Sequence, residues 1–252
     1  MTEPRAAVYD SLGSEYDRAF AVFLAHTDQK DKAHAWLEGA VAGLPARRLF
    51  IDAGAGTGKV TAWFTGKFER TIAIEPNPHL RAHLERNCPT AKIVPAPILD
   101  CVLPGQADFV LVSHVFYYIP PADWQPTLDR LASFVGPAGM LILVLQNPGT
   151  DCMGLVQHFH GRRFDLPALC RDFQTRHAGA YRSRIETVAC HIETAEFDPA
   201  CTVAEFMLNL LPLDEPPLRA DLEAYVRGNF AAPGGGYRFS CSQDFLVIER
   251  HK

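Results

Sequence analysis

The sequence has no long apolar run and no excess of positive charge, and each absence removes a class of protein. The longest apolar stretch, around MLILVLQ from Met140, is far shorter than the ~20 residues that a membrane-spanning helix needs. The 24 Lys and Arg against 29 Asp and Glu give a formal net charge of −5, which argues against nucleic-acid binding. The N-terminus has no apolar signal segment, so we expect no secretion and no membrane attachment.

The cysteines and histidines lack the spacings typical of disulfide frameworks and metal sites. The seven cysteines are odd in number and include no C-x-x-C pair, so a disulfide framework is not indicated. His158 and His160 have no third ligand placed by spacing, and we expect no metal. Reduced thiols packed as small apolar side chains predict a cytoplasmic protein.

Short apolar runs alternate with helical segments through the first part of the chain. The 252 residues are 48% apolar, enough for one full core. Residues 12–43 show helical periodicity, and an alternation of strands and helices then runs from residue 48 to Gln146. It predicts an α/β fold with βαβ units, a mostly parallel sheet and helices on both faces.

The individual elements follow from the same patterns. The predicted strands are LFIDAG, RTIAIEP, AKIVPAP, ADFVLVSHVF and MLILVLQ, and the predicted helices between them are KVTAWFTGKF, PHLRAHLERN and WQPTLDRLASFV. After Gln146 we expect helices in 151–180, one strand over 182–195 and two helices in 200–230. Tyr237, Phe239 and Cys241 alternate before a final buried strand, FLVIE, which predicts an antiparallel element at the C-terminal end.

A glycine-rich loop, Asp52-Ala-Gly54-Ala-Gly56-Thr57-Gly58, follows the first strand. Glycines let the backbone turn sharply and let a ligand approach it closely, and a following helix N-terminus favours electronegative groups. The third glycine comes one residue earlier than in G-x-G-x-x-G, which argues against a dinucleotide. Val60 after Lys59 excludes a P-loop.

An acid stands at the tip of the second strand. Glu75 lies 17 residues beyond Gly58, where its two carboxylate oxygens can accept both hydroxyls of a ribose. The glycine loop and Glu75 together resemble the class I S-adenosylmethionine-dependent methyltransferases, over residues 45–150. The resemblance implies S-adenosylmethionine as cofactor, S-adenosylhomocysteine as product, and a Rossmann-like sheet with a helical N-terminal lid and helical insertions.

The resemblance also implies which residues bind the cofactor. Glu75 would hold the ribose, Pro97 and Ile98 would flank the adenine, and Ser113 and His114 would face the methyl-bearing sulfur. The full cofactor set is Asp52, Gly54, Gly56, Thr57, Gly58, Glu75, Pro76, Pro97, Ile98, Ser113 and His114.

Further strings resemble the histamine N-methyltransferases within that superfamily. They are FLAHTDQ, IEPNP, SHVFYYIP, MLILVLQNPG and GRRFDLPALC, in matching order and spacing. The resemblance implies an acceptor pocket formed by Tyr16, Phe20, Phe23, Asp28, Gln29, Tyr117, Tyr118, Phe164, Cys170, Phe206 and Cys241. It divides the single domain 1–252 into a helical lid (1–44), a cofactor-binding core (45–150), acceptor-side insertions with a late strand (151–235) and C-terminal strands (236–252).

Four departures from the histamine enzymes concern the acceptor. The family's histamine-binding glutamate falls on Gln29, beside Asp28, and its pocket glutamine falls on His114. Its tryptophan pair falls on Met153 and Gln157, and its pocket asparagine falls on Cys241. The implied fold and cofactor therefore carry over, whereas histamine as the acceptor does not.

Methyl transfer depends mainly on holding the acceptor atom in line with the methyl group. A neutral sp² ring nitrogen already has a lone pair, whereas an amine or hydroxyl must lose a proton. His114 is the candidate base, and an orienting role is as well supported. The sequence lacks the D/N-P-P-Y/F loop of nucleic-acid amino-methyltransferases and the clustered carboxylates of metal-dependent catechol methylation.

Four functions remain open at this level. The leading one is a monomeric N-methyltransferase acting on a small nitrogenous molecule, heteroaromatic acceptors included. The others are methylation of a phenol or carboxylate, a nicotinamide-dependent oxidoreductase that uses the glycine loop, and a non-catalytic cofactor-binding protein.

Overall fold

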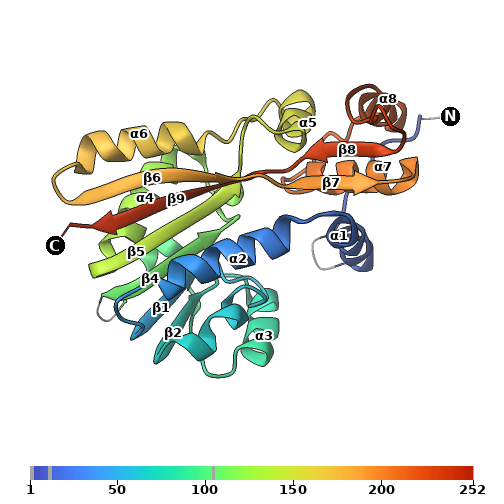
Figure 1. Cartoon of the computed structure of the whole chain (residues 1–252). Coiled ribbons are helices and arrows are strands. Elements are labelled where there is room, and N and C mark those ends of the chain that lie inside the picture. The colour runs from blue at the N-terminus through green and yellow to red at the C-terminus, as the bar shows by residue number, and fades with distance from the viewer. Residues whose placement is uncertain (1–2, 11–12, 104–105, 252) are drawn as a thin grey trace. The chain divides into compact units, whose positions relative to one another are not determined.

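A seven-stranded sheet forms the framework of the protein (Figure 1). In the computed structural model its strands run in the order β3-β2-β1-β4-β5-β9-β6. They are β1 (Leu49–Ala53), β2 (Arg70–Ile74), β3 (Lys92–Val94), β4 (Ala107–Ser113), β5 (Val135–Gln146), β6 (Tyr181–Val188) and β9 (Gln243–Arg250). The sheet is mostly parallel with an antiparallel C-terminal strand, which confirms the fold class expected from the sequence.

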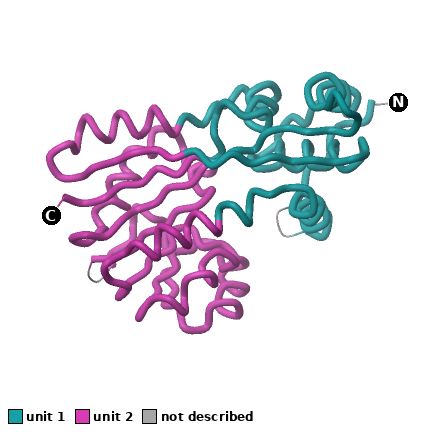
Figure 2. The backbone as a smooth tube through the Cα atoms, in the orientation of Figure 1, with its two compact units in different colours: residues 1–33, 146–165, 187–243 teal, residues 34–145, 166–186, 244–252 magenta. Residues whose placement is uncertain are grey.

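The structure describes residues 3–10, 13–103 and 106–251, so position 12 of the first expected helix lies outside it. The chain forms two compact units, coloured separately in Figure 2. The first unit comprises residues 1–33, 146–165 and 187–243, and the second comprises 34–145, 166–186 and 244–252. Each unit is therefore built from three separate segments of the chain.

The second unit holds most of the sheet, with helices on both faces. Every residue of β1 is buried, as expected for a central parallel strand covered on both sides. The helices are α2 (Gln29–Ala42, which begins in the first unit), α3 (Pro78–Asn87), α4 (Trp124–Ser133) and α6 (Leu166–His177). On one face Trp36 of α2 packs on Phe245 of β9, with ring centroids 4.2 Å apart. On the other face α4 contacts α6 (Figure 1).

The start of β1 is fixed by a buried carboxylate on β4. Asp108 accepts hydrogen bonds from the backbone N–H groups of Arg48 (2.7 Å) and Leu49 (3.1 Å) and from the Arg48 guanidinium (2.9 Å). Burial alone would raise the pKa of Asp108, but these hydrogen bonds outweigh it and hold the pKa below its usual value. Strands β1 and β4 are thereby held together at their N-terminal ends, and the glycine loop follows the other end of β1.

The helix predicted over 59–68 is wrong. The segment forms two short 3₁₀ turns instead, at Thr61–Trp63 and Thr65–Lys67. Its β-branched residues lower helix propensity, and Gly66 adds backbone entropy, so the segment has little intrinsic preference for a longer helix. Tertiary contacts decide its conformation: Phe64 is fully buried, and its ring lies edge-on to Phe50 and Phe109.

The first unit is built around one central helix. Helix α7 (Phe197–Leu208) contacts α1 (Ser14–His26), α5 (Asp151–His160), α8 (Arg219–Asn229) and β7 (His191–Thr194). Strand β7 pairs antiparallel with β8 (Tyr237–Ser240) in a two-stranded sheet. Eight of the nine residues from Ala200 to Leu208 are buried, with Thr202 half-buried, as expected for a helix enclosed by its neighbours.

The single strand predicted over 182–195 is also wrong, because it is two strands in two sheets. β6 ends at Val188 and β7 begins at His191. At the break the Cys190 N–H donates to the Ser242 side chain (3.3 Å), and the Cys241 N–H donates to the Cys190 carbonyl (2.9 Å). The Ser242 side chain replaces a regular backbone contact of the sheet there. The pattern of apolar and β-branched residues does not indicate this break.

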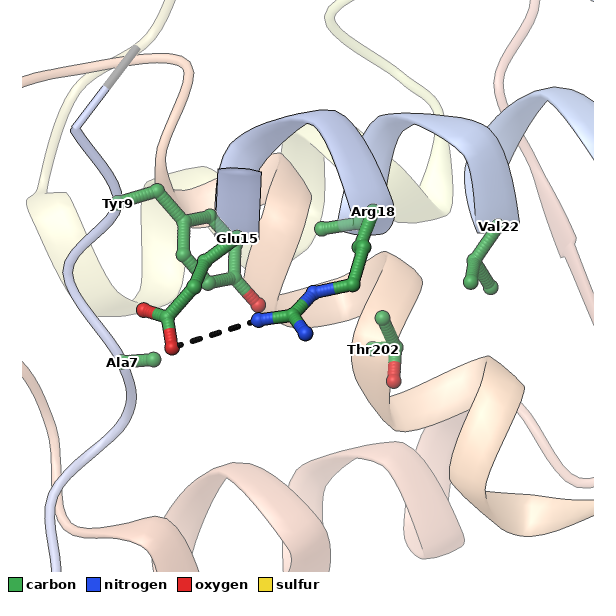
Figure 3. A pocket seen from close by; sticks show the side chains of 7 residues that line it. Ala7, Tyr9, Glu15, Arg18, Val22 and Thr202 are labelled. Carbon is green, nitrogen blue, oxygen red and sulfur yellow. Dashed lines mark ion pairs between the residues drawn. The ribbon is translucent and has the colours of Figure 1, made fainter. Parts of the chain in front are cut away.

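The N-terminal segment is tied to α7 in the first unit. The Ala7 N–H donates to Glu205 Oε1 (2.6 Å), the Tyr9 hydroxyl donates to Glu205 Oε2 (3.0 Å), and Arg219 pairs with the same carboxylate (3.1 Å). The segment, α1 and Thr202 line a cavity of about 280 Å³ (Figure 3). Within the described residues, no helix has the length and apolar character needed to cross a bilayer.

All seven cysteines lie in the described part of the chain, and each is a buried free thiol. Burial raises the pKa of several of them, to about 12 for Cys241 and about 11 for Cys190. They pack as small apolar side chains, as the sequence predicts.

Candidate functional site

The glycine loop that follows β1 has a backbone conformation that only glycine adopts readily. Gly54, Gly56 and Gly58 have φ values of 81°, 57° and 83°. A Cβ on Gly54 would lie 2.3 Å from Val115 Cγ2, and a Cβ on Gly58 would lie 2.7 Å from Leu84 Cδ1. A Cβ on Gly56 would meet nothing within 4 Å. Two glycines therefore allow close packing, and the middle one faces open space where a ligand can approach the main chain.

Glu75 holds this loop from the end of β2. Its side chain is buried, with one carboxylate oxygen accepting from the Gly56 N–H (2.8 Å) and the other from the Asn77 N–H (2.8 Å). Each carboxylate oxygen has two acceptor positions, so each keeps one for a ligand hydroxyl. The sequence predicted Glu75, but the role of Asn77 in orienting it was missed, because a backbone N–H has no signature in the sequence.

Asp52 lies near the end of β1, just before the loop, and has an unusual pKa. It is buried and accepts a hydrogen bond from the Thr61 hydroxyl (2.6 Å). Burial raises its pKa to about 7, the Thr61 hydrogen bond opposes this shift, and the nearby charge of Glu75 adds to it. Asp52 thus fixes the segment that follows the loop, and Thr61 is a partner that the sequence did not suggest.

Four other predicted cofactor residues, Thr57, Pro76, Pro97 and Ile98, differ in how exposed they are to solvent. Ile98 is buried at the start of a 3₁₀ turn, and Pro97 before it is exposed. Pro76 is also exposed. Thr57 is half-buried, and its carbonyl accepts from the Asn87 side chain of α3 (2.8 Å). Their contact with a cofactor remains a prediction.

The end of β4 lies beside the glycine loop. Ser113 and His114 are both half-buried, and the contact of Val115 with Gly54 brings this strand end against the loop. His114 has φ of 59°, a left-handed conformation that few residues other than glycine adopt. Its Nδ1 lies 3.4 Å from the Tyr117 hydroxyl. These side chains belong to the second unit, together with Asp52 and Glu75.

The tyrosine pair after β4 divides between core and surface. Tyr117 is 3% exposed, whereas Tyr118 is 63% exposed. Both lie on one short 3₁₀ turn, Phe116–Tyr118, so that neighbouring side chains point in different directions. Tyr117 therefore faces the core and Tyr118 faces solvent.

Four of the predicted acceptor residues form an aromatic cluster in the first unit. The Phe206 ring lies 5.4 Å from Tyr16, 5.6 Å from Phe20 and 5.4 Å from Phe23, measured between ring centroids. Phe23 and Phe206 are buried, and Tyr16 and Phe20 are half-buried. The spacing by four and three therefore places Tyr16, Phe20 and Phe23 in a single aromatic stripe on α1.

Three more predicted acceptor residues meet elsewhere in the first unit. Gln29 is buried, and its amide donates to the Cys241 carbonyl (3.0 Å). Asp28 accepts from the His191 N–H (2.9 Å) and pairs with Lys32 (2.6 Å). Burial would raise the pKa of Asp28, but these two hydrogen bonds lower it overall. Both side chains already have partners within the fold.

Phe164 and Cys170 are both buried, but they belong to different units. Phe164 lies in the first unit. Cys170, on α6 in the second, donates its thiol hydrogen to the Ser183 hydroxyl (3.6 Å). Their place in an acceptor pocket remains a prediction. Among the described residues, no group of three or more His, Cys, Asp or Glu side chains is arranged to hold a metal ion.

A family model matches the part of the chain that contains the glycine loop and Glu75. The model is that of the methyltransferase domain, and it covers residues 24–184. The chain belongs to this methyltransferase family. Membership removes the nicotinamide-dependent oxidoreductase from the functions left open by the sequence. A search of curated proteins gave no match.

Solved structures share the fold at low sequence identity. The N-methyltransferase NodS from Bradyrhizobium japonicum WM9, in complex with S-adenosyl-L-homocysteine, has a TM-score of 0.57 and 13% identity over 95% of this chain and 99% of that one. The YcgJ protein from Bacillus subtilis has a TM-score of 0.60 and 13% identity, over 87% and 99%. A functionally unknown protein from Deinococcus radiodurans R1 has a TM-score of 0.54 and 15% identity, over 98% of this chain and 90% of that one.

As a methyltransferase of this fold, the protein uses S-adenosylmethionine, and its residues fit that group. Gly56 leaves open space above its Cα, and Glu75 keeps an acceptor position on each oxygen, which suits a ribose diol. Asp52 holds the segment after the loop through its hydrogen bond with Thr61.

Replacing Glu75 with alanine should raise the dissociation constant for S-adenosylhomocysteine at least about 30-fold, because charge-assisted hydrogen bonds are worth roughly 1.5–3 kcal/mol each. Isothermal titration calorimetry measures the change. Glu85→Ala, on the exposed face of α3, is the matched control and should leave the constant unchanged. An affinity of Glu75→Ala within a factor of three of wild type would contradict the assignment.

Asp52 should make the folded state less stable as the pH rises. Its pKa is about 7 in the folded protein against 3.8 as the usual value, so the unfolded chain loses this proton first. The stability contributed by protonated Asp52 is present below about pH 4 and is lost progressively up to about pH 7, on the order of 4 kcal/mol in total.

The test compares urea unfolding of wild type and Asp52→Asn at about pH 5 and about pH 8. Asparagine keeps an oxygen for Thr61 and cannot ionise, so the variant should gain stability relative to wild type at the higher pH. An unchanged difference between the two proteins would show that Asp52 titrates normally.

Proposed function

We propose that the protein is an S-adenosylmethionine-dependent N-methyltransferase whose acceptor is a small, neutral, nitrogenous ring. The observation that carries this proposal is the position of His114, half-buried at the end of β4, where Val115 packs against the glycine loop. Glu75 and the loop hold the cofactor, and His114 contacts the acceptor. The seven reduced thiols support a cytoplasmic location, and we propose that the enzyme acts as a monomer.

Positioning accounts for most of the catalysis in this scheme. When bound, the cofactor supplies an electrophilic methyl group: the acceptor lone pair forms the new C–N bond, the electron pair of the broken C–S bond stays on sulfur, and the positive charge passes to the acceptor. Holding two reactants in line can lower a barrier by about 7–11 kcal/mol. A ring nitrogen with a free lone pair therefore needs an ordered pocket and no strong base.

The first unit supports a neutral acceptor. A protonated amine would require an available carboxylate, and the nearest candidate by sequence, Asp28, is already paired with Lys32 and the His191 N–H. The Gln29 amide is held by the Cys241 carbonyl. Within the first unit, the cluster of Tyr16, Phe20, Phe23 and Phe206 offers an uncharged aromatic surface.

Histamine should therefore be methylated poorly or not at all. A screen with isotopically labelled S-adenosylmethionine against amines, imidazoles and fused heterocycles with carbonyl groups should favour the neutral heterocycles. With the best acceptor, His114→Ala should lower turnover at least tenfold. Efficient methylation of histamine, with a micromolar Michaelis constant, would overturn the neutral-acceptor proposal and return the carboxylate role to Asp28.

The aromatic cluster should affect acceptor binding and leave cofactor binding unchanged. Phe20→Leu keeps volume but loses the ring, so the acceptor KM should rise at least about fivefold while affinity for S-adenosylhomocysteine stays constant. Phe197→Leu is the matched control, since this aromatic residue of α7 packs on Arg227 and Tyr237 and lies outside the cluster. A lower melting temperature with unchanged KM would make the cluster a purely structural core.

A further inference from the structure

His114 adopts a backbone conformation that costs energy. Among the described residues, only His114 and Ala138 combine a side chain with positive φ. The left-handed region costs roughly 1–2 kcal/mol for most residues, and histidine tolerates it better than β-branched ones. The His114 N–H donates to the Val144 carbonyl of β5 (2.9 Å), so the strand ladder fixes the backbone up to this turn. Such strain concentrates at functional sites.

The turn brings the imidazole against a buried phenol. Tyr117 lies one 3₁₀ turn further along the chain, and its ring is nearly parallel to that of His114, with an interplanar angle of 20° and centroids 5.9 Å apart. The Tyr117 hydroxyl is 3.4 Å from Nδ1. Because Tyr117 is 3% exposed, its hydroxyl is shielded from bulk water at this contact.

The direction of this hydrogen bond determines the tautomer of His114. A phenol hydroxyl is a better hydrogen-bond donor than acceptor, and an unprotonated imidazole nitrogen is a strong acceptor. The favoured pairing is therefore donation from the Tyr117 O–H to Nδ1. In the neutral ring the single N–H must then be on Nε2.

We propose that Tyr117 is a positioning residue that holds His114 in the Nε2–H tautomer, so that His114 donates a hydrogen bond to the acceptor and does not act as a base. This inference rests on the proposed function and narrows its substrate class. The acceptor presents a carbonyl oxygen or an unprotonated ring nitrogen to Nε2–H, and the atom that is methylated already carries a lone pair. Tyr117 then contacts His114, in place of the acceptor contact implied by the family resemblance.

The tautomer can be measured without any acceptor. Imidazole ¹⁵N resonances of the whole protein, bound to S-adenosylhomocysteine and assigned with His114→Gln, should show an unprotonated Nδ1 and a protonated Nε2. Tyr117→Phe should move both resonances towards the average of exchanging tautomers. Tyr118→Phe, which changes the adjacent exposed tyrosine, should leave them in place. A protonated Nδ1 in the wild type would overturn the proposal.

Measurements of kcat/KM distinguish His114 as a hydrogen-bond donor from His114 as a base. A glutamine amide can replace an Nε2–H donor but cannot accept a proton, so His114→Gln should keep kcat/KM within about tenfold of wild type while His114→Ala loses more. The wild-type rate should be flat from about pH 5.5 to pH 8, because neutral and protonated imidazole both donate from Nε2. Tyr117→Phe should lower kcat about fivefold without changing affinity for S-adenosylhomocysteine.

Equal loss in His114→Gln and His114→Ala, or a rate that rises with pH through the imidazole titration, would show that His114 is a base and would overturn the inference. These outcomes are distinct from failure of the proposed function. If no neutral heterocycle is methylated, the proposed function fails, and the ¹⁵N spectrum still decides the hydrogen bond between Tyr117 and His114.

Discussion

The cofactor site depends on one carboxylate. Glu75 binds the Gly56 N–H with one oxygen and the Asn77 N–H with the other, so a single side chain joins the loop after β1 to the segment after β2. Two loops that follow different strands are thereby held at a fixed spacing before any ligand arrives. A charged group buried among N–H donors is stable only while both hydrogen bonds persist. The loop is therefore ordered by the same residue that the sequence predicts as the ribose ligand.

Most of the sheet could be predicted because its signals are local. Apolar runs ended by glycine or proline identify buried strands, and the alternation with helices determines their parallel arrangement. The segment 59–68 was mispredicted as a helix, because its aromatic residues have the right spacing and its conformation is decided by packing of Phe64 on Phe50 and Phe109. The strand break at Cys190 was missed because it depends on Ser242, more than fifty residues away in the sequence.

The site could be predicted where side-chain chemistry determines it. Glycines and an acid have few other reasons to occur in that order, so the sequence predicts Gly56 and Glu75 as site residues, and the structure joins them by a hydrogen bond. The contact of Val115 with Gly54 was not, since it involves an ordinary apolar residue and depends on how two strand ends are placed. The left-handed turn at His114 was also unforeseen, because histidine rarely adopts it and the sequence around it contains no glycine.

The tether between the N-terminal segment and α7 has a consequence for how the protein is made. The Ala7 N–H and its partner Glu205 are 198 residues apart. A ribosome that adds about 5–20 residues per second needs roughly 10–40 s to supply that partner. The aromatic side chains of α1, Phe20 and Phe23 among them, are therefore synthesised well before α7, the helix that covers them. The first unit can complete its fold only after residue 243 has been made.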